Sequence, residues 1–76
     1  MLMTHPRIAR DPAIMMGKPC IRGTRITVEL ILEHLSEGMS VAELLQGYEH
    51  LTEDDVLAAL RFAADYISHE SLIAAE

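Results

Sequence analysis

The positions of proline and glycine divide this chain into two unlike parts. All three prolines and two of the four glycines lie within the first 23 residues, at Pro6, Pro12, Gly17, Pro19 and Gly23. Proline fixes φ and lacks an amide hydrogen, and glycine weakens a helix, so this segment cannot form one continuous helix. Short stretches of strand-like composition remain at 8–10 and 20–26. The sequence therefore predicts an extended arm or β-hairpin over residues 1–26.

From residue 27 onward the apolar residues recur with a helical period. The first run follows the i, i+3, i+4, i+7 rule at Val28, Ile31, Leu32 and Leu35. Thr27 stands where an N-cap hydroxyl would accept a hydrogen bond from the first turn, and Gly38 provides a left-handed stop. We therefore expect a first helix between these two residues.

Two capping boxes predict two further helices. Ser40 and Glu43 form the first box, and the short helix that it opens should end near Gly47. Thr52 and Asp55 form the second box, which opens the longest helix. The apolar face expected for this third helix consists of Val56, Leu60, Ala63, Ala64 and Ile67. Arg61 and Asp65, four residues apart, should form an ion pair on another face of it.

A chain of 76 residues has room for one domain. We expect a mainly α fold with a small β arm over 1–26, a three-helix core over 27–69 and a C-terminal tail over 70–76. Consecutive helices that are joined by short links are typical of a tri-helical helix-turn-helix core. A domain of this size buries only about 60% of the surface that its unfolded chain exposes, so we also expect a homodimer, built in part by the strand edge of the arm.

No residue pattern indicates catalysis or a metal site. Cys20 is the only cysteine and has no assignable histidine base, so we interpret it as a small buried hydrophobe. The histidines lack metal-ligand spacing, and they are His5, His34, His50 and His69. No phosphate-binding glycine loop or paired-carboxylate motif occurs. We expect a protein that is not an enzyme and uses no cofactor. Without a long apolar stretch, it should lie in the cytoplasm and not at a membrane.

The charges are as unevenly distributed as the prolines. Residues 1–25 carry a net charge of +4 and the remainder −10, which together give the total of −6. Either the arm binds an anionic partner or it neutralises acidic helices. The candidate side chains for binding phosphate oxygens are Lys18, Arg22, Thr24 and Arg25. The alternative for the arginines is pairing with acids of the chain itself, such as Glu29 or Glu33. The third helix begins with three acids at 53–55, so any DNA should contact the arm instead.

Three segments of this sequence resemble the bacterial domain-of-unknown-function family 433. They are GKPCIRGTRITV at 17–28, EGMSVAELLQGY at 37–48 and HLTEDDVLAAL at 50–60, and the resemblance covers residues 8–67. It implies a homeodomain-like helical core with a β-containing arm. Many members resemble antitoxins encoded beside a PIN-like ribonuclease toxin. The sequence departs from the usual family pattern at Thr27 and at Glu49-His50, where proline is common.

The resemblance leads us to expect a non-catalytic antitoxin of a type II toxin–antitoxin pair that neutralises a PIN-like toxin. Its expected contacts are Met15, Met16 and Ile21 of the arm, because methionine adapts to irregular surfaces. Arg22 or Arg25 could pair with the carboxylates that such a nuclease uses to hold metal ions. The alternatives are a stand-alone DNA-binding transcriptional regulator and a homodimeric structural module without a nucleic-acid role.

Overall fold

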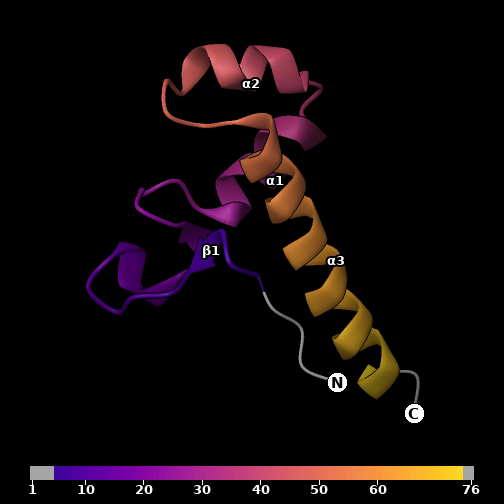
Figure 1. Ribbon diagram of the computed structural model, residues 1–76. Coiled ribbons are helices and arrows are strands. Elements are labelled where there is room, and N and C mark those ends of the chain that lie inside the picture. Colours follow the sequence, from indigo (N-terminus) through magenta and orange to yellow (C-terminus); the bar gives the residue numbers. More distant parts are fainter. Residues whose placement is uncertain (1–4, 75–76) are drawn as a thin grey trace.

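The computed structural model describes residues 5–74, which form a small hairpin followed by three helices (Figure 1). The elements in chain order are β1 (Ile8–Ala9), the 3-10 helix η1 (Met15–Gly17), β2 (Cys20–Ile21), α1 (Val28–Ser36), α2 (Val41–Gly47) and α3 (Glu53–Ala74). α2 lies at one end of the molecule, and α3 runs from that end past α1 and the hairpin (Figure 1). The predicted mainly α fold with a small N-terminal β arm is confirmed.

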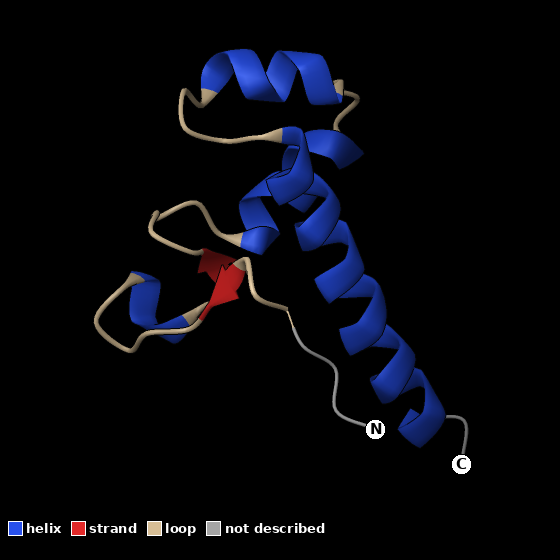
Figure 2. Ribbon diagram, in the orientation of Figure 1, coloured by secondary structure: helices blue, strands red, loops and turns tan. Residues whose placement is uncertain are grey.

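The arm is a two-stranded antiparallel hairpin with a long connection (Figure 2). Ile8 pairs with Ile21 and Ala9 pairs with Cys20. The connection includes a left-handed stretch in which Met15, Met16 and Gly17 have φ values of 49°, 58° and 82°. Glycine adopts this region freely, whereas each methionine is strained by its Cβ atom.

The helices α1 and α2 begin at the predicted caps. The Thr27 hydroxyl accepts a hydrogen bond of 2.9 Å from the amide of Leu30, and Gly38 after α1 has a φ of 96°. At the start of α2, the Ser40 hydroxyl accepts from the Glu43 amide at 3.1 Å, while the Glu43 carboxylate accepts from the Ser40 amide at 2.9 Å. Both helix starts are therefore set by residues within one turn of the cap.

The third helix also begins at its predicted capping box. The Asp55 carboxylate accepts from the Thr52 amide at 3.1 Å, and the Thr52 hydroxyl accepts from the Asp55 amide at 3.2 Å. The predicted pair of Arg61 and Asp65 is present at 3.6 Å. The helical core was expected to end at residue 69, but α3 continues to Ala74, so a separate tail over 70–74 is not formed. Residues 75–76 lie outside the described part of the chain.

The core lies where the hairpin, α1, α2 and the first half of α3 meet. Its buried apolar side chains come from every one of these elements and from the link before α3, and they are Ile8, Ile21, Val28, Ile31, Leu44, Leu51, Val56 and Ala59. The arm is thus an integral part of the fold. No helix within residues 5–74 combines the length and the apolar character that a membrane crossing requires.

The buried face of α3 differs from the predicted one. Val56 is buried as expected, but Ala59 is buried in place of Leu60, while Leu60 and Ile67 are exposed. The arm covers the side of α3 that carries Asp55 and Phe62, as contacts from Arg7 and Arg10 show. Because the arm packs on this side, the face of α3 that is buried differs from the face that the spacing of apolar residues predicted.

Candidate partner-binding site

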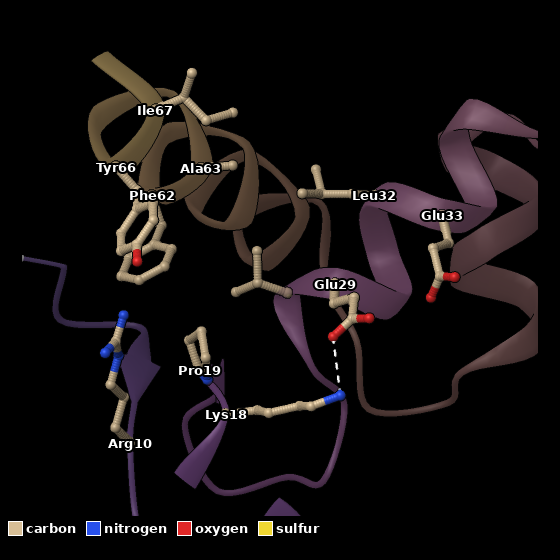
Figure 3. Close-up of a pocket in the computed structure, with 11 residues that line it drawn as sticks. Arg10, Lys18, Pro19, Glu29, Leu32, Glu33, Phe62, Ala63, Tyr66 and Ile67 are labelled. Carbon is tan, nitrogen blue, oxygen red and sulfur yellow. Dashed lines mark hydrogen bonds and ion pairs between the residues drawn. The ribbon is translucent and has the colours of Figure 1, made fainter. Parts of the chain in front are cut away.

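An apolar groove of about 460 Å³ lies between the arm, α1 and the later turns of α3 (Figure 3). Its walls are mainly apolar, and the side chains that form them are Pro19, Val28, Leu32, Phe62, Ala63 and Ile67. Tyr66 also lines it and stacks on Phe62 with ring centroids 6.3 Å apart. Tyr66 and Ile67 are 51% and 58% exposed, so the groove presents large apolar groups to the surroundings.

The edge of this groove carries charges of both signs. Lys18 donates a hydrogen bond of 3.1 Å to the carboxylate of Glu29, and Glu33 lies one turn further along α1 (Figure 3). On the opposite side, the guanidinium of Arg10 lies 5.5 Å from the ring centroid of Phe62 (Figure 3). The groove therefore has an acidic edge on α1 and a basic edge on the arm.

Polar contacts with α3 fix the arm that forms one wall. His5 Nε2 lies 2.8 Å from Asp65 Oδ2, and the His5 ring meets Phe62 edge-on at 5.1 Å. Arg7 donates to the buried Asp55 at 3.0 Å and lies 3.7 Å from Asp54. Sequence reasoning did not assign these contacts, because no local pattern connects residues separated by 48 or 60 positions.

The candidate basic residues serve mostly to hold the arm in place. Lys18 pairs with Glu29, one of the two acids considered from the sequence as partners for Arg22 or Arg25. Arg22 instead donates to backbone carbonyls, from Nε to Pro6 at 2.7 Å and from Nη2 to Ile8 at 3.2 Å. These two cations thus satisfy carbonyl and carboxylate oxygens of their own chain.

Thr24 and Arg25 differ in how far the fold uses their side chains. The Thr24 hydroxyl donates to the Ile21 carbonyl at 2.8 Å and accepts from the Ile26 amide at 3.0 Å, so it stabilises the turn. Arg25 is exposed, and among the side chains of residues 5–68 it has no hydrogen-bond or ion-pair partner. The four predicted side chains therefore occupy different local environments, and Arg25 is the most available to a ligand.

The three apolar residues of the arm that were predicted to contact a partner differ in solvent exposure. Met16 is almost fully exposed and Met15 is partly exposed, so both remain accessible. Ile21 is only 3% exposed and packs in the core, which removes it from the accessible contact surface. Its position in the hairpin explains this outcome, because it pairs with Ile8 and belongs to the buried cluster that the hairpin shares with the helices.

Cys20 and the histidines occupy structural environments. Cys20 is buried and donates to the Lys18 carbonyl at 3.3 Å, and burial raises the pKa of its thiol. His34 Nε2 lies 3.2 Å from the hydroxyl of Tyr48. Within the described residues, no three histidine, cysteine or acidic side chains gather into a metal-binding group. The side chain of His69 lies outside the described part.

Comparisons with known proteins agree on one family. The family model described as "Protein of unknown function (DUF433)" matches residues 8–63. The crystal structure of a DUF433 member protein from Anabaena variabilis ATCC 29413, at 2.00 Å resolution, is similar to this chain with a TM-score of 0.77. The two sequences are 28% identical, and the match covers 92% of this chain and 69% of the other. No curated protein matches significantly.

Proposed function

This chain belongs to the DUF433 family of proteins of unknown function, and we propose that it is a non-catalytic antitoxin that binds a PIN-like ribonuclease toxin. The observation that carries the proposal is the exposed apolar groove between the arm and α3. Monomeric proteins rarely expose aromatic and aliphatic side chains together in a hollow unless a partner covers them. The toxin class comes from the resemblance of the family to antitoxins.

The groove favours a protein partner of particular chemistry. An amphipathic helix of the toxin would place one or two large apolar side chains against Phe62, Tyr66 and Ile67. A lysine or arginine of that helix would face the acidic edge at Glu33, and an acid would face Arg10. Aromatic side chains in such a position commonly contribute much of the binding energy.

Neutralising a nuclease requires no chemistry from the antitoxin. A bound protein that covers the substrate channel prevents RNA from reaching the metal ions of the enzyme. Arg25, exposed on the turn after β2, is the cation of the arm best placed to contact acidic groups at that channel. The groove would then supply affinity and Arg25 would contribute to inhibition.

Co-expression with the product of the adjacent reading frame tests the proposal. We expect a complex that survives affinity purification, together with relief of toxicity. Tyr66→Glu combined with Ile67→Glu should weaken binding at least about a hundredfold, because two buried charges would face apolar groups. Ala42→Glu is the control, since Ala42 is exposed on α2 and lines neither the groove nor the hollow around Leu57.

The outcomes separate the candidate functions. No complex with the neighbouring product, and no relief of toxicity, would contradict the antitoxin proposal. Binding of operator DNA in its place, abolished by Arg25→Glu, would establish the DNA-binding regulator. Retention of the toxin by the Tyr66 and Ile67 double variant would show that the groove is not the contact surface.

A further inference from the structure

A second exposed apolar surface lies on α3, away from the groove. It forms the outer face of the helix, around Leu57, Leu60 and Ala64, and lines a hollow of about 630 Å³ together with Arg7. Leu57 is 55% exposed, and Leu60 is also exposed. None of these residues lines the groove, so the two surfaces are formed by different side chains.

Two opposite charges border this outer face. Asp54 and Arg61 are seven residues apart, which places them on the same edge of the helix about 10 Å apart along its axis. Their side chains are 73% and 72% exposed. Among the described side chains, Asp54 lies 3.7 Å from Arg7 and Arg61 lies 3.6 Å from Asp65, and both contacts are long for an ion pair. Both charges therefore remain available to a partner.

A surface with an acid at one end and a base at the other is complementary to itself under a two-fold rotation. In such an interface, residue i of one copy contacts residue j of the other, and j contacts i. An antiparallel pair of α3 helices centred between Leu57 and Ala58 places Asp54 opposite Arg61 of the other copy, twice. A parallel pair in register would instead place like charges opposite each other.

We propose that this outer face of α3 binds a second copy of the chain in an antiparallel homodimer. Leu57 and Ala58 of the two copies meet at its centre with Leu60 beside them, and two Asp54–Arg61 pairs between the copies set its register. The sequence suggested the strand edge of the arm as part of a dimer interface, whereas this proposal uses the exposed leucines of α3. The proposal is independent of the antitoxin function, because it uses different residues.

Two charge variants give a decisive test of the register. Asp54→Arg and Arg61→Asp each place like charges opposite each other at both ends of the dimer. We expect each variant alone to dimerise about tenfold more weakly than the wild type, measured by analytical ultracentrifugation. Mixed together, one copy of each variant restores two opposite-charge pairs, so a heterodimer of wild-type affinity should form.

This mixing experiment excludes effects within one chain. Each variant loses a contact with Arg7 or Asp65 of its own chain. These contacts are still missing in the mixture, so they cannot account for a recovery of affinity. Failure of the mixture to form a heterodimer, with both variants folded by circular dichroism, would overturn the proposal. A wild-type chain that stays monomeric at high micromolar concentration would also overturn it.

The apolar part of the interface is tested by replacing both leucines with glutamine. Leu57→Gln with Leu60→Gln keeps good helix formers at exposed positions, so the fold should survive while dimerisation falls at least about tenfold. Met16→Gln, on the exposed connection of the arm, is the control and should leave the dimer unchanged. A dimer that resists the leucine exchange but dissociates with Met16→Gln would assign the interface to the arm.

Discussion

The N-terminal arm and the helices α1 and α2 differ in the sequence separation of the contacts that fix them: these contacts are long-range in the arm and local in the helices. Each of the two helices begins at a cap whose partner lies three residues away, at Thr27–Leu30 and Ser40–Glu43. The arm is held by Arg7 and His5, whose partners on α3 are 48 and 60 residues away. A short segment can therefore be as well fixed as a helix without containing any local signal of its position.

The most severe test of this comparison is to remove an apolar side chain that joins the arm to the core. Ile21→Ala should lower the free energy of unfolding by about 2–5 kcal/mol, as expected for a buried isoleucine. Ile31→Ala in α1 is the matched control, and urea denaturation should give similar losses for both. A loss below about 1 kcal/mol for Ile21→Ala alone would show that the arm is only loosely attached.

A smaller effect is expected where the long-range and local contacts share one residue. Asp55→Ala should cost about 1–3 kcal/mol, because it removes both the cap of α3 and the partner of Arg7. A double-mutant cycle with Arg7→Met isolates the arm contact. Full additivity in that cycle would mean that Arg7 contributes nothing through Asp55.

The purely local cap of α2 gives a more modest loss. Ser40→Ala removes the hydroxyl that accepts from the Glu43 amide and should cost about 1 kcal/mol in thermal or urea denaturation. Ser36→Ala, at the exposed end of α1, is the control and should change stability by less than about 0.5 kcal/mol. Equal losses of stability in the two variants would show that the Ser40 cap contributes no more than an ordinary surface serine.

The strained connection of the arm predicts a change of opposite sign. Met16 has a left-handed φ of 58° and an exposed side chain, so Met16→Gly should relieve strain and stabilise the protein by about 0.5 kcal/mol. Gly38→Ala is the inverse control, because alanine would be strained at a φ of 96°. Destabilisation by Met16→Gly would mean that this backbone conformation is not the stable one.

The smallest effect is a pH dependence at the cap of α2. The Ser40 amide, and secondly its hydroxyl, hydrogen-bond the Glu43 carboxylate and lower its pKa. A lowered pKa means that the stabilisation is present above the usual glutamate value and is lost as the pH falls through the lowered one. The stability difference between wild type and Glu43→Gln should therefore shrink in acid. A difference that is constant with pH would contradict this assignment.

The range of the contacts also decides what the sequence could predict. Thr27, Ser40 and Thr52 lie next to the groups that they cap, so all three helix starts followed from local spacing. The hairpin followed from the positions of proline and glycine. The buried face of α3 could not be predicted from the sequence, because periodicity identifies which residues share a face but not which face the arm will cover.

The candidate site was less predictable for the same reason. Arg10, Lys18 and Phe62 are brought to one groove only by the docking of the arm. The concentration of positive charge in the arm was visible in the sequence. Its use was not, because a cation that binds a ligand and one that pairs internally, as Lys18 does, look the same in a sequence.

The contact between His5 and Asp65 has a consequence for how the protein is made. Residue 5 leaves the ribosome well before residue 65, so the arm cannot dock until α3 has been synthesised. Until then, Ile8 and Ile21 have no α3 to pack against, and their apolar surface stays open to other chains. During synthesis, aggregation is therefore avoided if α3 follows quickly or if a chaperone covers the arm.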